Sequence, residues 1–563
     1  MEKQLIECVP NFSEGRNPQI IKLITDAIES VEGIKLLDVD PGKATNRTVV
    51  TFVGEPELVI EAAYRGIKKA AEVIDMSKHT GEHPRAGATD VCPLIPIANI
   101  SMEETVAYAK RLGERVGNEL SIPVYLYEYA ASEPKRRNLA NIRAGEYEGF
   151  PEKIRQAEWK PDYGQAIFNA RSGVTVIGAR DLLVAYNVNL NTTSVRRANA
   201  VAFDVREAGR IERKGHPVTG EIVKDENGEP KRIPGTCKSV KGIGWYIEEY
   251  GIAQISMNLT NLNDTPLHVA FDEVCKSAES RGMRVTGSEL VGLVPLKSML
   301  DAGKFFLKKQ QRSVGVSEDE LVMTAVRSMG LSELKPFEPR KRIIEYLLED
   351  VSESKLVSMN LTKFADETAS ESPAPGGGSI SAYVGALGVS LATMVANLSS
   401  HKVGWEEQWE TFSEWAEKGQ VLKNQLLKLV DADTQAFNAI MAAFQLPKES
   451  VEEKAARKAA IQKATLQAIE IPFTVMQKSL DAMQIIKAMA ETGNPNSVTD
   501  AGVGALCARA AVLGAFLNVK INCASYDDKD YVSAKLQAGE QLATEALLAE
   551  KEILAMVEHK IQG

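Results

Sequence analysis

Two of the six histidines, His79 and His83, stand four residues apart in the stretch DMSKHTGEHPRAGATDVCPLIP. With Glu82 they form H-x-x-E-H, a pattern in which two imidazoles on one helical face bind zinc beside a general base. Gly81 and Pro84 argue against that helix, because glycine costs roughly 1 kcal/mol and proline about 3 kcal/mol in a helix interior. Three interpretations stay open: a zinc site, two structural histidines, or one catalytic imidazole on a rigid loop.

A second candidate lies in the stretch LLKLVDADTQAF. On a helix, the residues three and four positions from Asp433 are all apolar, whereas those around Asp431 are mixed. We therefore expect Asp433 to point into a helical core and Asp431 to point toward water. A buried carboxylate is unfavourable unless it is paired or has a chemical role, so a structural polar network and an active site are both open.

The stretch PAPGGGS places Gly376, Gly377, Gly378 and Ser379 just before an apolar segment, residues 380–398. Glycines at the start of a helix let the backbone approach a ligand closely and turn N–H groups toward it. A flexible linker is the alternative. The apolar segment has about the length of a membrane span, but its polar residues and glycines favour a buried bundle helix.

Length and composition restrict the class of protein. The 563 residues are too many for one core, and roughly three or four folding units are expected. A net charge of −10 disfavours nucleic-acid binding but leaves room for a small anionic substrate. The six cysteines stand singly, and the N-terminus lacks a signal-peptide pattern, so we expect a cytoplasmic protein without a disulfide framework.

The elements that must position these residues change in type along the chain. Strand-like and helix-like segments alternate over residues 1–181 and again over 182–348. Residues 349–356 are polar and are predicted to be a linker. Long helical segments fill residues 357–563. The predicted fold class is α/β plus all-α multidomain, with two α/β subdomains followed by a helical bundle.

Two details complete this prediction. A charged excursion over residues 210–236 contains glycine and proline and is predicted to be a long hairpin or loop. In the rear part, the helical stretch 452–489 is predicted to be broken at Pro472.

Several long stretches resemble known families. ECVPNFSEGR, LLDVDPGKATNRTVVTFVG, SKHTGEHPRAGATDVCPLIP and GQAIFNARSGVTVIGARDLLVAYNVNLN resemble the formiminotransferase family. SPAPGGGSISAYVGALG, LVDADTQAFNAIM and LGAFLNVKIN are similar to the cyclodeaminase/cyclohydrolase family. Together they follow the order of the bifunctional formimidoyltransferase-cyclodeaminases. The resemblance implies a transferase and lyase of histidine breakdown and one-carbon metabolism.

For the front part, the resemblance implies that His83 is the acid/base. The formimino carbon of N-formimidoyl-L-glutamate would pass to N5 of tetrahydrofolate, and an imidazole can accept one proton and return another. Asp40 is a candidate for orienting that ring, with a turn residue as the alternative. Arg47 and Arg85 are candidates for holding carboxylates, with a surface ion pair as the alternative for Arg47.

The resemblance also implies folate-binding residues. In the front part they are Gly164, Gln165, Ala166, Ile167, Phe168, Asn169, Ala170, Arg171, Ser172 and Gly173. In the rear part they are Gly376, Gly377, Gly378 and Ser379.

For the rear part, the resemblance places the catalytic aspartate at Asp433. N10 of 5-formimidoyl-tetrahydrofolate would attack the formimino carbon, and ammonia would leave to give 5,10-methenyl-tetrahydrofolate. Asp433 would move the proton between the two nitrogens. Asp500 and Asn518 are candidates for a second group of residues that positions substrate, with a helix cap and a buried amide as their alternatives.

The implied partners are small molecules. Polyglutamylated tetrahydrofolate acts as a co-substrate, and no metal, nucleic acid or membrane span is expected. A homo-oligomer, a ring of dimers (an octamer), follows from the resemblance. Three alternatives remain: a rear methenyl-tetrahydrofolate cyclohydrolase, a folate-binding scaffold without turnover, and a zinc hydrolase.

Overall fold

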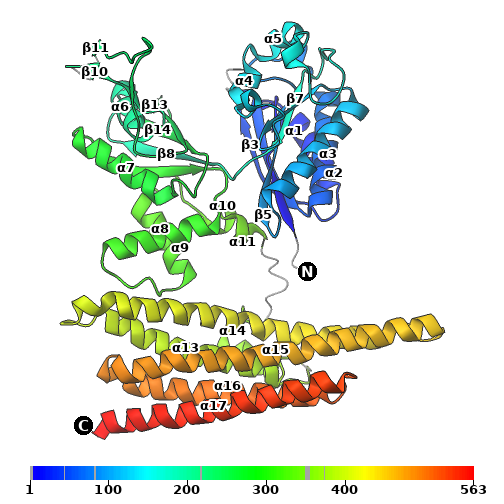
Figure 1. Cartoon of the computed structure of the whole chain (residues 1–563), viewed down its shortest axis with the longest axis vertical. Helices are drawn as coiled ribbons and strands as arrows, with labels where there is room; N and C mark the ends of the chain where they lie inside the picture. The colour runs from blue at the N-terminus through cyan, green and yellow to red at the C-terminus, as the bar shows by residue number, and fades with distance from the viewer. Residues whose placement is uncertain are drawn as a thin grey trace. The chain divides into compact units, whose positions relative to one another are not determined.

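The computed structural model describes residues 4–43, 45–81, 84–215, 219–348, 356–372 and 374–562. Contacts divide the chain into two compact units, residues 1–298 with 329–348 and residues 299–328 with 349–563. Strands and helices alternate in the first unit, and the described part of the second is helical (Figure 1). The predicted fold class, two α/β subdomains followed by a helical bundle, is confirmed.

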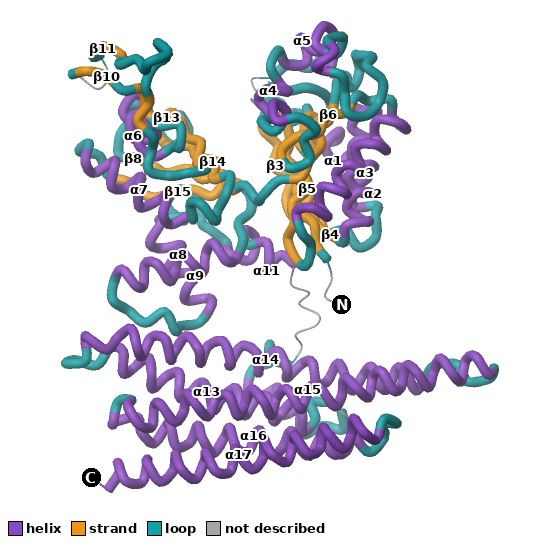
Figure 2. The backbone as a smooth tube through the Cα atoms, in the orientation of Figure 1, coloured by secondary structure: helices purple, strands orange, loops and turns teal. Residues whose placement is uncertain are grey.

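The first subdomain is built on a mixed sheet of seven described strands in the order β1-β4-β2-β5-β7-β6, with β3 paired to β4. The strands are β1 (Leu5–Cys8), β2 (Asn11–Phe12), β3 (Lys35–Gly42), β4 (Arg47–Gly54), β5 (Thr89–Ala98), β6 (Val124–Glu128) and β7 (Thr175–Ala179). The helices α1 (Pro18–Glu29), α2 (Pro56–Val73) and α3 (Met102–Leu120) cover one face (Figure 2). The short helices α4 (Leu139–Arg143) and α5 (Glu146–Lys153) follow β6.

Local sequence explains where the covering helices begin. Asn17 caps α1, its side chain accepting from the N–H of Gln19, and proline follows at the first helical position. Ser101 and Glu104 form a capping box at the start of α3. The central strand β5 is almost wholly buried, because it pairs antiparallel to β1 and β2 and parallel to β7.

The second subdomain has an antiparallel four-stranded sheet in the order β13-β14-β8-β15. Its strands are β8 (Val184–Leu190), β13 (Val240–Ile247), β14 (Ile252–Leu259) and β15 (Val285–Val291), and its helices are α6 (Val195–Val205) and α7 (Leu267–Ser280). Between α6 and β13, β9 (Arg210–Ile211) pairs with β12 (Arg232–Ile233), and β10 (Arg213–Lys214) pairs with β11 (Glu221–Ile222). The prediction of a hairpin over residues 210–236 is confirmed for its described residues (Figure 1).

The helices after the second sheet are α8 (Leu296–Lys309), α9 (Glu318–Met329), α10 (Pro339–Arg342) and α11 (Ile344–Leu348). Residues 299–328 pack with the bundle: the Gly315 carbonyl accepts hydrogen bonds from Asn397 at 2.8 Å and Gln420 at 3.1 Å. A Cβ on Gly315 would lie 2.2 Å from the Ala416 side chain, so the approach is close. The predicted domain ranges, which assign this segment to the front part, stay a prediction, and the predicted linker lies outside the described residues except for Leu356.

The bundle consists of α12 (Leu361–Thr368), α13 (Gly377–Ser400), α14 (Trp409–Phe444), α15 (Val451–Thr492), α16 (Val498–Cys523) and α17 (Lys529–Gln562). Segments Gly377–Ser400 and Pro495–Cys523 are long and apolar enough to cross a membrane, and 61% and 50% of their apolar windows are buried inside the protein. Core helices of a bundle have the same character, so length and composition alone do not establish a membrane span. Gly388 and Gly504 let α13 and α16 approach closely, because a Cβ on Gly388 would lie 2.9 Å from the Gly504 carbonyl oxygen.

The predicted break at Pro472 is wrong, because α15 continues through it. Proline has no N–H, so the carbonyl of Ala468 loses its helical donor. Asn522 of α16 donates to that carbonyl at 2.7 Å. The neighbouring helix therefore supplies the missing hydrogen bond.

Candidate active sites

His83 and the residue before it lie outside the described residues, so the predicted acid/base role of His83 stays a prediction. The residues on either side are held by close contacts. A Cβ on Gly81 would lie 2.3 Å from the Thr45 carbonyl oxygen. The Ala86 N–H donates to Asp90 at 2.9 Å. Both flanks of the segment are thus fixed to the sheet.

His79 is held by both of its ring nitrogens. Nε2 lies 2.9 Å from the Asn46 carbonyl oxygen, which requires the proton on Nε2. Nδ1 then accepts from Arg85 Nε at 3.4 Å. Burial lowers the pKa of His79, with Arg85 acting in the same direction against the Asn46 bond. This geometry supports the structural interpretation of His79, since neither nitrogen is left for another ligand.

Arg85 was predicted to hold a substrate carboxylate, but two protein carboxylates already contact its guanidinium. Nη1 lies 2.7 Å from Glu146, and Nη2 lies 2.6 Å from Glu148. The Arg85 side chain is 10% exposed, whereas those of Glu146 and Glu148 are 43% and 63% exposed. A bound anion would have to displace these partners or share the guanidinium with them.

Arg47 lies in a second cluster, on β4. Its Nη2 donates to Asn11 Oδ1. Burial, with Arg143 nearby, lowers the pKa of the Arg47 guanidinium to about 10, against the opposing influence of Asp90 and Asp40. Asp40 is exposed near the end of β3, close enough to act on Arg47. Its predicted role toward His83 stays a prediction.

The central pair of this cluster was missed in the sequence. Asp90 is fully buried at the start of β5 and pairs with Arg143 at the end of α4. The two are 53 residues apart in the chain. One signal was present: Asp90 is the single charge immediately before the apolar run VCPLIP, where an aspartate is unfavourable without a partner.

The predicted folate-binding loop, residues 164–173, lies beside α5. The Phe168 ring is 5.2 Å from the Tyr147 ring, centroid to centroid. Ile167 is 67% exposed, so the loop offers apolar surface to solvent. The structure therefore brings this loop to the same corner as Arg85, which the neighbouring carboxylates of α5 hold. Folate binding by residues 164–173 stays a prediction.

In the bundle, Asp433 lies on α14 opposite the N-terminus of α13. The Ser379 hydroxyl lies 3.1 Å from Asp433 Oδ2 and 2.8 Å from the Val430 carbonyl oxygen, so its one proton has two acceptors. Burial raises the pKa of Asp433, and hydrogen bonds from the Ser379 side chain and backbone oppose that rise. Among the described residues, no lysine or arginine pairs with this carboxylate.

The glycines before Ser379 bring backbone against Asp433. A Cβ on Gly378 would lie 2.1 Å from Asp433 Oδ1, so a larger residue would force the carboxylate to move. A Cβ on Gly377 would lie 3.2 Å from Asn518 Nδ2, and Asn518 donates to the Gly514 carbonyl at 3.0 Å. The structure thus brings the predicted glycines, Asp433 and Asn518 together.

Two other acidic residues lie elsewhere. Asp500 is in the first turn of α16 and precedes Asn518 by about 27 Å along that helix at 1.5 Å per residue. The structure does not bring these two candidates together. Asp431 was predicted to point toward water, and this is wrong: its carboxylate accepts from the N–H groups of Leu356, at 2.8 Å, and Val357, at 3.4 Å.

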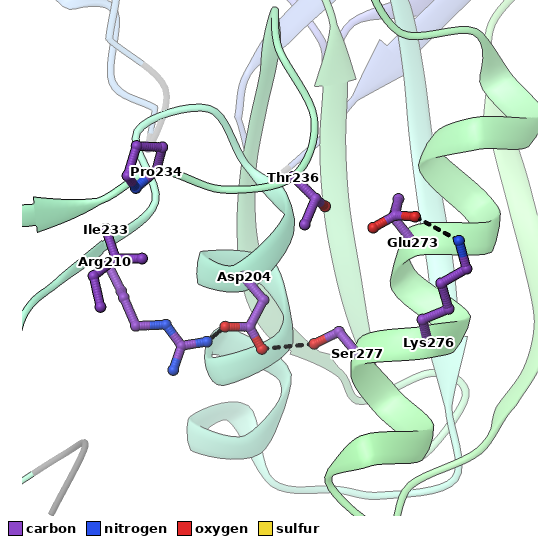
Figure 3. Close-up of a pocket in the computed structure, with 8 residues that line it drawn as sticks. All are labelled: Asp204, Arg210, Ile233, Pro234, Thr236, Glu273, Lys276 and Ser277. Atoms are coloured by element: carbon purple, nitrogen blue, oxygen red, sulfur yellow. Dashed lines mark hydrogen bonds and ion pairs between the residues drawn. The ribbon is translucent and has the colours of Figure 1, made fainter.

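A cavity among the described residues lies at the base of the excursion between α6 and α7 (Figure 3). It has a volume of about 470 Å³. Asp204 accepts from Arg210, from Ser277 at 2.7 Å and from Arg281 Nε at 2.8 Å. None of the predicted site residues lines it. These contacts fasten the excursion to the second subdomain.

The site geometry and the fold define a class of protein: an enzyme with one polar site on an α/β sheet and a separate carboxylate site in a helical bundle. Residues 5–180 match the formiminotransferase domain, N-terminal subdomain, residues 185–349 match the formiminotransferase domain, and residues 360–541 match formiminotransferase-cyclodeaminase. The chain belongs to the formimidoyltransferase-cyclodeaminase family.

Three relatives illustrate the match. The formimidoyltransferase-cyclodeaminase of Gallus gallus is 43% identical over 558 residues, which cover 99% of each chain. The glutamate formimidoyltransferase of Streptococcus pyogenes serotype M1 is 40% identical over 54% of this chain and 94% of its own. The methenyltetrahydrofolate cyclohydrolase of Methylorubrum extorquens is 36% identical over 35% of this chain and 95% of its own.

Proposed function

We propose that this chain transfers the formimino group of N-formimidoyl-L-glutamate to N5 of tetrahydrofolate and then cyclises the product with release of ammonia. The observation that carries the proposal is the presence of two distinct polar sites in two compact units, each within the part of the chain that matches a relative named for the corresponding chemistry. The chain is accordingly a bifunctional enzyme, a transferase joined to a cyclodeaminase.

In the first reaction, N5 of tetrahydrofolate attacks the formimino carbon to form a tetrahedral adduct. The attacking nitrogen loses a proton, and the glutamate nitrogen gains one as its bond to carbon breaks. We assign both transfers to His83, because a group that titrates near neutrality can accept and return a proton. Arg47 and Arg85 are proposed to hold substrate carboxylates, Arg85 after its contacts with Glu146 and Glu148 are displaced or shared, and residues 164–173 are proposed to contact the folate.

In the second reaction, N10 attacks the carbon of the protonated formimino group, and the formimino nitrogen, after receiving the N10 proton, departs as ammonia and leaves the 5,10-methenyl cation. Asp433 is the proposed carrier of the proton from N10 to the leaving nitrogen. Its raised pKa suits this role, since the carboxylate is then a stronger base toward N10 and its protonated form persists more readily until the leaving nitrogen takes the proton. The backbone at Gly377 and Gly378 is the proposed contact surface for the folate ring.

Assembly and location are part of the proposal. Exposed apolar side chains on α16 and α17, including Leu517, Ile521 and Leu548, support a homo-oligomer. A ring of dimers that acts on polyglutamylated folates in the cytoplasm is the proposed state. Light scattering of the purified protein tests the assembly, and cell fractionation tests the location.

The function is tested by mixing the protein with tetrahydrofolate and N-formimidoyl-L-glutamate without added metal. Methenyl-tetrahydrofolate absorbance, released glutamate and released ammonia are followed together. Parallel release of glutamate and ammonia supports both reactions. Glutamate release without ammonia points to a rear domain that is a cyclohydrolase or a folate-binding scaffold. No reaction until zinc is added contradicts the assignment of His83.

A further inference from the structure

Lys153, the last residue of α5, is a buried lysine with an unusual set of partners. It is 8% exposed. Its ammonium donates to the carbonyl oxygens of Asn141 at 3.0 Å, Ile142 at 2.8 Å and Ala144 at 3.0 Å. All three protons of the ammonium are thus directed at the backbone where α4 ends.

The groups that contact the Lys153 ammonium are neutral: backbone carbonyls and aromatic rings. No carboxylate lies within ion-pair distance among the described residues. Its Nζ lies 4.0 Å from the centroid of the Trp159 ring and 5.4 Å from that of Phe150. A lysine on the last carbonyls of a helix often has only a capping role. Here the bonded carbonyls belong to residues on both sides of Arg143, and the Arg143 side chain pairs with Asp90.

Two side chains from this corner, Glu146 and Glu148, contact the segment that follows His83, and a third, Arg143, acts on it through Asp90. Arg143 pairs with Asp90, which accepts the N–H of Ala86. Two residues after Ala144, α5 begins, and its first turn supplies the two carboxylates that hold Arg85. The first turn of α5 and the end of α4 therefore fix consecutive residues, Arg85 and Ala86, from two sides.

We propose that Lys153 is a positioning residue for formimino transfer: by fixing the carbonyls on both sides of Arg143, it sets the corner that holds the segment carrying His83. The proposal deepens the front half of the proposed function and rests on it. A displacement of about 1 Å at a catalytic group lowers turnover by up to roughly 100-fold, so the corner matters for rate.

The test compares Lys153→Met, Lys153→Arg and Lys135→Met in the full chain. Lys135 also lies over Trp159, at 5.0 Å, but its ammonium pairs with exposed glutamates, so its substitution is the matched control. For Lys153→Met we expect a fall in transferase kcat of about 10- to 100-fold with KM changed by less than about threefold. Lys153→Arg, which keeps a cation and its donors, recovers part of kcat, and Lys135→Met behaves like the unmodified chain.

Cyclisation of supplied 5-formimidoyl-tetrahydrofolate serves as an internal measure of folded protein. It stays constant in all three variants if the proposal holds. The proposal is overturned if Lys153→Met keeps full kcat, if it raises KM alone, if Lys153→Arg is as slow as Lys153→Met, or if cyclisation falls in parallel. If the unmodified chain releases no glutamate, the proposed function fails instead.

Discussion

The front and rear sites bury ionisable groups in two different ways. In the front, charge faces charge: Arg85 meets Glu146 and Glu148, and Asp90 meets Arg143. In the rear, among the described residues, Asp433 faces only a hydroxyl and backbone, and burial raises its pKa. In the front, ion pairing offsets the desolvation of the charged groups, whereas in the rear desolvation is expressed as a raised pKa of Asp433.

The difference between the two sites distinguishes side chains that orient a loop or a substrate from side chains that transfer a proton. A buried pair of opposite charges keeps both groups ionised at neutral pH and favours one geometry, so it suits side chains that orient a loop or a substrate. A buried carboxylate without a cation changes its protonation more easily, which suits proton transfer. In the front, paired charges hold their protonation state, so the proton carrier is expected to be a separate residue, and His83 is the one proposed.

The largest expected effect comes from replacing each of the two proposed proton carriers, Asp433 and His83, in separate variants. Asp433→Asn should lower cyclisation by about 10²- to 10⁴-fold and leave transfer unchanged, because an amide cannot carry the proton. His83→Ala should do the reverse. Released glutamate reports transfer, and methenyl-tetrahydrofolate formed from supplied 5-formimidoyl-tetrahydrofolate reports cyclisation. A folded variant that loses both reactions would contradict the division into two sites.

Glu7 tests the comparison inside the front sheet, because it is a buried carboxyl on β1 and no described residue forms an ion pair with it. Burial raises its pKa to about 7, against the influence of Arg180, and Oε2 has no hydrogen-bond partner in the described part of the chain. A folded-state pKa above the unfolded value means that this group's contribution to stability is present at low pH and is lost as pH rises through about 7.

Glu7→Gln imitates the neutral carboxyl, so it should stabilise the α/β unit above pH 7 by up to about 3 kcal/mol at 1.36 kcal/mol per pKa unit. The gain should shrink as the pH is lowered toward 5. Calorimetric melting temperatures at pH 5 and pH 8.5 measure it. Equal melting temperatures at pH 8.5 would show that Glu7 is ionised and paired in solution, like the other front carboxylates.

Gly378→Ala probes how closely the rear backbone must approach its carboxylate. The new Cβ would lie 2.1 Å from Asp433 Oδ1, so the carboxylate must move. We expect a loss of roughly tenfold or more in cyclisation kcat. Gly502→Ala on α16 is the control, since its Cβ would meet only side chains, the nearest at 3.3 Å. Equal activity of the two variants would contradict a role for this contact.

The smallest effect is a shift in pH dependence. Ser379 bonds lower the pKa of Asp433, so Ser379→Ala should raise it further. Because N10 must give its proton to an ionised carboxylate, the acidic limb of the cyclisation profile should move to higher pH. Ser381→Ala removes a hydroxyl that, among the described residues, donates to the Gly377 carbonyl alone, and it serves as control. A shift toward lower pH would reverse the sign and contradict the argument.

Helical spacing was sufficient to predict the half-buried position of Asp433, because positions three and four residues away lie beside it on any α-helix. Helical spacing did not predict which residues surround Asp433 and Asp431. Phe437, one of the expected core neighbours, is 36% exposed. Asp431 accepts the N–H of Leu356, which lies 75 residues earlier, and spacing within one helix carries no information about such a partner.

The same limit explains the other differences. The continuation of α15 through Pro472 depends on Asn522 of another helix, and the Asp90–Arg143 pair joins residues that lie far apart in sequence. Local patterns predicted the fold class and singled out the glycines at 376–378, since helix and strand periodicity and the need for close backbone approach are local properties. The contact of Gly378 with Asp433 was not predicted. Partners that come from a distant segment could be found only in three dimensions.

The excursion over residues 210–236 also offers a practical opportunity. Both of its ends are pinned: Arg210 and Arg281 share the carboxylate of Asp204, and a Cβ on Gly235 would lie 2.0 Å from the Arg206 carbonyl oxygen. Its tip is an exposed turn in which Asp225 accepts from the N–H groups of Asn227 and Glu229. Because the ends of the excursion are fixed, we expect an affinity peptide or a fluorescent module inserted at this tip to leave the sheet undisturbed. The tip is therefore a suitable position for labelling the active enzyme.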